Sequence, residues 1–101
     1  MSNPDTPPPP RVLIVDDDFT ARLLEREALE QSGFTVVEAS DGAEALAAVD
    51  RQPPDLMLLD VGMPGLDGFE VCRRLRRRWA ASDLPVIMVT GMDDLASINL
   101  A

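Results

Sequence analysis

The sequence contains no histidine, no lysine and no tyrosine, and its only cysteine is Cys72. Without histidine, the chain can supply neither an imidazole acid or base nor a histidine ligand for a metal ion. A single cysteine cannot form an internal disulfide, which is consistent with a reducing compartment. No apolar run approaches the roughly 18 residues that a transmembrane helix requires, and the N-terminus lacks the basic and apolar regions of a secretory signal.

Basic residues are also few, because nine arginines stand against 18 acidic residues and give a formal net charge of −9. This balance disfavours nucleic acids and anionic membranes as partners and favours cations or basic proteins. Apolar residues make up 46% of the 101 residues, which is enough for one domain with a modest core. We therefore expect a cytoplasmic chain with one domain that binds neither nucleic acid nor membrane.

Proline concentrates at the N-terminus, where the segment MSNPDTPPPP holds five prolines in ten residues. Such a composition favours an extended chain without a packed core. Residues 1–10 are therefore expected to form a disordered tail, and residues 11–101 the folded domain. A proline-rich ligand for a recognition module is a less favoured interpretation of the tail.

Short apolar runs alternate with amphipathic segments along the rest of the chain. In the first helix, Leu24 and Ala28 trace the stripe that is expected to face the core, and Gly33 is expected to end that helix in a left-handed conformation. Continuous apolar strands that alternate with helices indicate an α/β fold with a parallel sheet covered on both faces. The expected strands are 12–15, 34–39, 56–59 and 84–89, and the expected helices are 20–31, 43–51, 67–79 and a last one from Asp93 or Asp94 to Ala101.

Carboxylates follow two of the expected strands. Asp16, Asp17 and Asp18 come directly after the apolar run VLIV, and Asp60 comes directly after LMLL. Because parallel strands end at one edge of a sheet, a strand order of 2-1-3-4 would bring Asp16, Asp17 and Asp60 together, with Thr90 alongside. Carboxylate oxygens without histidine or thiolate favour a hard cation, Mg²⁺ or else Mn²⁺ or Ca²⁺. Asp18 is better explained as a helix cap.

The segments VDDD, LLDVGMPGLDGFE and PVIMVTG, in this order and spacing, resemble the signatures of two-component response-regulator receiver domains. The resemblance covers residues 12–101 without a large gap. It implies a flavodoxin-like (CheY-like) doubly wound parallel sheet with the strand order 2-1-3-4, to which the family adds a fifth strand. The segment from Val89 to Ala101 weakly resembles receivers that are joined to cyclic-di-GMP enzymes.

The resemblance assigns roles to the clustered acids. Asp60 matches the phosphoacceptor, whose carboxylate would attack the phosphorus of a phosphohistidine. Asp17 matches the direct Mg²⁺ ligand, and Asp16 matches the acid that holds the ion through water. Gly62 matches the position that offers a backbone carbonyl to the metal. The resemblance therefore implies a Mg²⁺ site formed by these four residues.

The resemblance also implies a switch and a set of partners. Thr90 matches the hydroxyl that bonds the phosphoryl group, and Gly91 matches the small residue beside the phosphoryl site. A histidine kinase or a histidine phosphotransfer protein would supply the phosphoryl group, and the full-length protein would carry an output domain. The domain itself is not expected to be an enzyme.

The sequence departs from the family pattern at its C-terminal end. Receivers continue through a fifth strand, which ends in a lysine, and a fifth helix, whereas this sequence ends at Ala101. We therefore expect a C-terminally incomplete receiver whose fourth strand is an exposed edge, through which a homodimer could form.

Two other functions compete with the receiver. An aspartyl-phosphate-type phosphatase usually carries a second aspartate two residues after the nucleophile, and Gly62 stands there instead. A scaffold receiver that acts without phosphorylation is favoured by the missing lysine and disfavoured by the complete set of acids.

Overall fold

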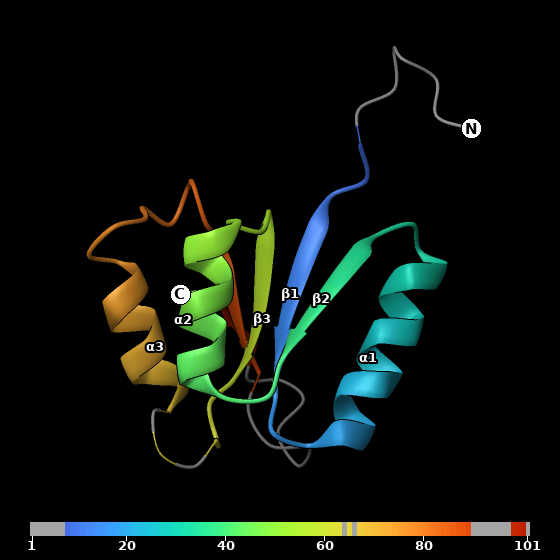
Figure 1. Cartoon of the computed structure of the whole chain (residues 1–101), viewed down its shortest axis with the longest axis horizontal. Coiled ribbons are helices and arrows are strands. Elements are labelled where there is room, and N and C mark those ends of the chain that lie inside the picture. The colour runs from blue at the N-terminus through green and yellow to red at the C-terminus, as the bar shows by residue number, and fades with distance from the viewer. Residues whose placement is uncertain (1–7, 64, 66, 90–97, 101) are drawn as a thin grey trace.

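The computed structural model describes residues 8–63, 65, 67–89 and 98–100. Its four longer strands run parallel in the order β2-β1-β3-β4, which confirms the doubly wound order that was predicted. The helices lie on both faces of this sheet, with α1 on one face and α2 and α3 on the other (Figure 1). The elements are β1 Arg11–Val15, α1 Phe19–Gln31, β2 Thr35–Ala39, α2 Gly42–Arg51, β3 Leu56–Asp60, α3 Gly68–Leu75, β4 Val86–Val89 and β5 Ile98–Leu100.

The side chains of β1 alternate between two apolar layers, because successive side chains of a strand point to opposite faces. Val12 and Ile14 pack on the α1 face with Leu29 of that helix. Leu13 and Val15 join the larger core, which also contains buried residues of α2 and α3. Full burial of such a side chain stabilises the fold by about 1.5–3 kcal/mol, so β1 is held firmly from both faces.

Aspartates cap the three helices that the described residues form, and the cap at Asp18 is the one that was predicted above. Each accepts a hydrogen bond from a backbone N–H of the first turn and so satisfies a donor that has no partner within the helix. At the other end of α1, Gly33 adopts a φ of +94°, the left-handed conformation that was expected there. The capping bonds run from Thr20 to Asp18 at 3.0 Å, from Glu44 to Asp41 at 2.7 Å and from Glu70 to Asp67 at 2.9 Å.

The short strand β5 was not predicted. It pairs antiparallel with β4, so that Ile98 lies opposite Val89 and Leu100 opposite Ile87. An unpaired strand edge presents N–H and C=O groups that pair with any extended segment within reach, and here residues 98–100 occupy the edge. The predictions of an open fourth edge and of a helix over these three residues were therefore wrong. The start of that predicted helix lies outside the described residues.

The predicted inward face of α1 was also wrong. Leu24 is 62% exposed, and Phe19 and Leu23 are exposed beside it. Ala21, Glu25 and Leu29 are instead among the half-buried residues of the helix, and Leu29 packs against Val12, Ile14 and Val36 of the sheet.

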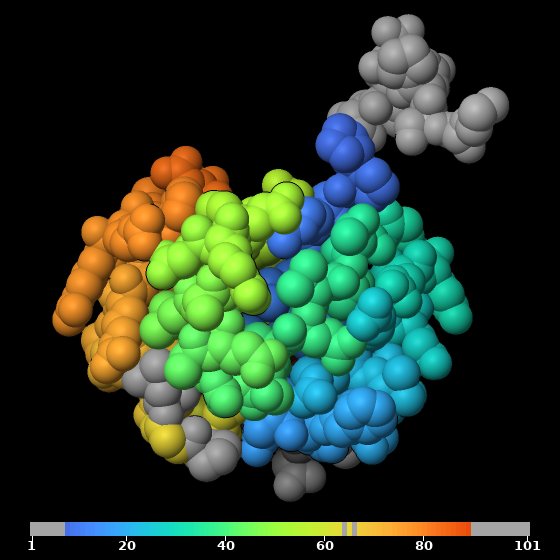
Figure 2. Space-filling view, viewed as in Figure 1, coloured from blue at the N-terminus to red at the C-terminus, as the bar shows by residue number. Residues whose placement is uncertain are grey.

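At the N-terminus, residues 8–10 are exposed (Figure 2), and the carbonyl oxygen of Pro10 accepts the N–H of Thr35 at 3.0 Å. Residues 1–7 of the predicted tail lie outside the described part. No helix among the described residues is both long and apolar enough to cross a membrane.

Candidate functional site

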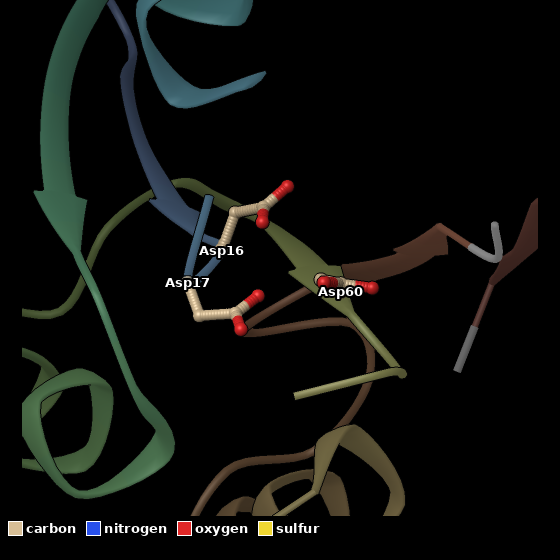
Figure 3. A group of neighbouring side chains, drawn as sticks. All are labelled: Asp16, Asp17 and Asp60. Atoms are coloured by element: carbon tan, nitrogen blue, oxygen red, sulfur yellow. The ribbon is translucent and has the colours of Figure 1, made fainter. Parts of the chain in front are cut away.

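Three carboxylates meet at the C-terminal ends of the adjacent strands β1 and β3 (Figure 3). Val15 pairs with Leu59, so the residues that follow them, Asp16 and Asp60, lie at the same level of the sheet. Each of Asp16, Asp17 and Asp60 offers an oxygen, and these oxygens lie within 4.8 Å of one another. The convergence predicted from the sequence is therefore present in the structure.

The backbone around Asp16 is fixed by three hydrogen bonds. Its N–H donates to the carbonyl oxygen of Ala39 at 3.1 Å, which extends the pairing of β1 with β2. Its carboxylate accepts the N–H of Asp18 at 2.9 Å. Its carbonyl oxygen accepts a bond from the guanidinium of Arg22 at 2.8 Å. The loop that carries Asp16 and Asp17 is thus tied to both β2 and α1.

Asp60 is oriented by the loop that follows it. Its Oδ1 accepts a hydrogen bond from the N–H of Gly62 at 3.0 Å, in a turn closed by the side chain itself. The second carboxylate oxygen does not take part in this bond. The carboxylate of Asp60 is partly buried, and the backbone N–H of Gly62 orients one of its two oxygens.

Negative charges crowd together at the three carboxylates, and burial together with this crowding raises the pKa of nearby acids. Burial raises the pKa of Asp16, and the charges of Asp60, Asp17 and Asp18 raise it further, while the hydrogen bond from the Asp18 N–H opposes the rise. Glu25 reaches toward the same group from α1. Burial, followed by the charges of Asp16 and Asp60, raises its pKa to about 7.

Such a group suits a divalent cation. Carboxylate oxygens at this spacing are the ligands that Mg²⁺ and other hard cations prefer, and a bound cation would offset their mutual repulsion. Asp16, Asp17 and Asp60 are the residues that could hold it. The predicted carbonyl ligand, Gly62, lies two residues after Asp60 in the loop, where its N–H is already bonded to that carboxylate.

The structure leaves two predicted site residues unplaced and reveals three others. Thr90 and Gly91 lie outside the described residues. Sequence reasoning missed Arg22 and Glu25 because α1 was predicted to turn another face inward. It assigned no role at the site to Gly68, although a glycine in the first turn of a helix is a sign of close backbone contact, here with Asp60.

Comparison with known proteins agrees with the fold. The sequence profile of the response regulator receiver domain matches residues 12–101. The chain is 46% identical over 86 residues to the response regulator MprA of Mycobacterium leprae (strain TN), a match that covers 85% of this chain and 37% of that protein. The chain thus spans about a third of the length of the curated relatives it matches.

Solved structures give the same result. The response regulator TrrA of Thermotoga maritima, solved in complex with Mg(2+)-BeF, superposes with a TM-score of 0.75 at 32% identity, over 87% of this chain and 76% of that one. A two-component system response regulator/GGDEF domain protein superposes with a TM-score of 0.77 at 37% identity, over 82% of this chain and 34% of that one. The chain therefore belongs to the family of response regulator receiver domains, the phosphoacceptor modules of two-component signalling.

Proposed function

We propose that Asp60 is the phosphoacceptor of this receiver and that it works with a Mg²⁺ ion held by Asp16, Asp17, Asp60 and the backbone carbonyl of Gly62. The observation that carries the proposal is the meeting of three carboxylates, from two separate segments, with oxygens within 4.8 Å. Three helix-capping roles would not require this convergence, and the capping role in this region already belongs to Asp18.

The chemistry follows from how Asp60 is held. The Gly62 N–H bonds one carboxylate oxygen, and the other attacks the phosphorus of a phosphohistidine. The new P–O bond forms as the P–N bond breaks, and the departing nitrogen keeps the electron pair and takes a proton from solvent. A bound Mg²⁺ would offset the negative charge on the phosphoryl oxygens during this transfer.

Two further roles belong to the segment after β4. We propose that the hydroxyl of Thr90 bonds the phosphoryl group once it is attached to Asp60, and that Gly91 leaves room for that group. A hydroxyl that bonds an oxygen present only after phosphorylation has two stable positions, which is the basis of a switch. Both residues follow β4, which pairs directly with β3 and its Asp60.

The proposed partners follow from the same chemistry. A histidine kinase or a histidine phosphotransfer protein supplies the phosphoryl group in the cytoplasm, and an output domain in the longer protein receives the signal. The length of MprA, of which the match covers 37%, supports an output domain. A homodimer through an open β4 edge is not proposed, because β5 occupies that edge.

Phosphorylation by a small-molecule donor tests the proposal. We expect phosphoramidate with MgCl₂ to add one phosphoryl group to the chain, as measured by intact mass, and EDTA to prevent the addition. Asp60→Asn should abolish the modification. Asp67→Asn is the matched control, because asparagine also caps helices and should leave both the fold and the labelling intact. Labelling of Asp60→Asn equal to that of wild type would refute the assignment.

The same protein separates a receiver from a phosphatase. A receiver holds its acyl phosphate and turns over a generic phosphate ester negligibly, whereas an aspartyl-phosphate-type phosphatase would hydrolyse p-nitrophenyl phosphate through many cycles. Gly62 supports the receiver, because such phosphatases usually carry an aspartate two residues after the nucleophile. Sustained hydrolysis that Asp60→Asn abolishes would favour the phosphatase.

A further inference from the structure

We propose that Arg22 is a positioning residue for the cation site: its guanidinium sets the direction of the Asp17 carboxylate by holding the backbone carbonyl of Asp16. The inference rests on the proposed function, because it concerns the same Mg²⁺ site. It extends that function to a residue of α1 that does not itself contact the cation.

The contacts of Arg22 place it between three elements. One terminal nitrogen donates to the carbonyl oxygen of Asp16 at 2.8 Å, and its Nε donates to Oε1 of Glu38 on β2 at 3.1 Å. The guanidinium also lies 5.7 Å from the centre of the Phe19 ring. The side chain is only 14% exposed, so these bonds are shielded from competing water. Arg22 therefore joins β2, the loop after β1, and the first turn of α1.

The carbonyl that Arg22 holds belongs to the peptide that joins Asp16 to Asp17. Peptide groups are planar, so fixing this carbonyl oxygen also fixes the N–H of Asp17. The position of the Asp17 Cβ then depends on only one remaining backbone rotation at its own N–Cα bond. A hydrogen bond to the carbonyl of one acid thus restricts where the carboxylate of the next acid can lie.

Glu38 makes this arrangement specific for arginine. Its carboxylate accepts from Arg22 and also from Arg26, one turn later on α1, so it is itself held in place. A guanidinium presents several N–H donors in a rigid plane and can bond the carboxylate and the carbonyl together. A lysine would bring the same charge, but its single nitrogen lacks the fork that reaches both acceptors.

The charge of Arg22 and its positioning bond predict opposite changes in Mg²⁺ affinity when the residue is replaced. Arg22 is a positive charge close to a proposed cation site, so removing the charge should by itself tighten Mg²⁺ binding. Removing the positioning bond should weaken binding, because ligands that lose their orienting partners typically lose about tenfold or more in metal affinity. The sign of the change therefore separates the two effects.

The experiment compares Arg22→Gln and Arg22→Lys with Arg26→Gln in the 101-residue chain. Arg26→Gln is the matched control. It removes an equal charge from the same helix and also removes an ion-pair partner of the same Glu38, while Arg26 makes no described bond to Asp16. Mg²⁺ affinity is measured by titration, and amide signals of residues 16–18 are recorded by NMR in EDTA. Thermal unfolding of each variant shows whether it folds.

We expect Arg22→Gln and Arg22→Lys to bind Mg²⁺ roughly tenfold more weakly and to shift the metal-free amide signals of residues 16–18. Arg26→Gln should bind at least as tightly as wild type. Unchanged metal-free signals in Arg22→Gln would overturn the positioning role whether or not Mg²⁺ binds. Tighter binding by Arg22→Gln would show that only its charge matters. No binding by wild type would instead overturn the proposed Mg²⁺ site, which the metal-free signals do not depend on.

Discussion

Gly68, in the first turn of α3, lies directly against the backbone of Asp60. A Cβ atom at residue 68 would lie 2.8 Å from the carbonyl oxygen of Asp60 and 2.9 Å from the Cα of Val61. Carbon atoms in folded proteins do not approach this closely without overlap, and both neighbours are backbone atoms that cannot rotate away. The absence of a side chain at residue 68 therefore allows α3 to begin beside the acid that we propose as the phosphoacceptor.

Replacing Gly68 with alanine should therefore destabilise the domain. We expect a loss of about 1–3 kcal/mol in the free energy of unfolding, the usual cost of forcing an extra carbon into a packed site. Urea unfolding measures this loss. Gly62→Ala is the control, because a Cβ there would lie 3.6 Å from the nearest atom, Oδ1 of Asp60, which is an ordinary contact. Equal stability of the two variants would show that the contact at Gly68 relaxes without cost.

Much of the fold was predictable because local and global signals agree. Among the parallel strands, β1, β3 and β4 are short apolar runs, each helix in the described part of the chain is capped by an aspartate, and the acids fall where β1 and β3 end. The inward face of α1 was not predictable in the same way. Apolar residues lie on more than one side of that helix, and the sheet accepts Leu29 with the partly buried Glu25 in place of Leu24.

The candidate site was predictable in its acids and not in its supporting contacts. Strand order alone places Asp16, Asp17 and Asp60 together, because side chains at the ends of adjacent parallel strands must be neighbours. The bond from Arg22 to the Asp16 carbonyl depends on the rotation of α1 about its own axis, which the sequence did not determine. The antiparallel pairing of β5 depends likewise on a connection that carries no periodic pattern.

Removing one acid from the cluster should stabilise the metal-free protein. Two charges about 5 Å apart repel by roughly 3 kcal/mol at an effective dielectric constant near 20, and exposure to solvent reduces this to about 1 kcal/mol. We therefore expect Asp17→Asn to raise the unfolding temperature in EDTA and to lose most of the stabilisation that MgCl₂ gives to wild type. Calorimetry with and without Mg²⁺ measures both effects.

Asp67→Asn serves as the control for that experiment, since it removes a carboxylate outside the cluster and keeps a capping side chain. Its response to MgCl₂ should match that of wild type. If Asp17→Asn responded to Mg²⁺ as wild type does, the ion would bind elsewhere, and Asp17 would not be a ligand.

Glu25 should make stability fall as pH rises. Its pKa is raised to about 7 in the folded protein, by burial first and then by the charges of Asp16 and Asp60, from an ordinary value of 4.5. Between these two values the folded state keeps a proton that the unfolded state has lost. This contribution to stability is therefore complete below about pH 4.5, declines as pH rises toward 7 and is absent above it.

Glu25→Gln should remove this dependence on pH. We expect the variant to exceed wild type in unfolding free energy at pH 8 by about 1 kcal/mol, allowing for solvent screening of a partly buried group, and the difference to shrink toward pH 4.5. Urea unfolding in EDTA at several pH values measures the difference. The other carboxylates are present in both proteins, so their titration cancels when the two free energies are subtracted. A difference that stays constant from pH 4.5 to pH 8 would show that Glu25 titrates normally.

Two leucines of α1 test which face of the helix packs on the sheet. Leu29 contacts the apolar layer formed by Val12, Ile14 and Val36, whereas Leu24 is 62% exposed. Leu29→Ala should therefore cost about 2 kcal/mol of unfolding free energy, near the lower end for a leucine in a core because Leu29 is only partly buried. Leu24→Ala should change it by less than about 0.5 kcal/mol.

The comparison is well controlled, because both variants make the same substitution in the same helix and alanine preserves helix propensity. Any difference between them then reports packing and not the intrinsic stability of α1. Urea unfolding of the 101-residue chain provides the measurement. A larger loss for Leu24→Ala than for Leu29→Ala would mean that α1 is rotated about its axis. Such a rotation would carry Arg22 away from the Asp16 carbonyl, since both contacts depend on the same helix face.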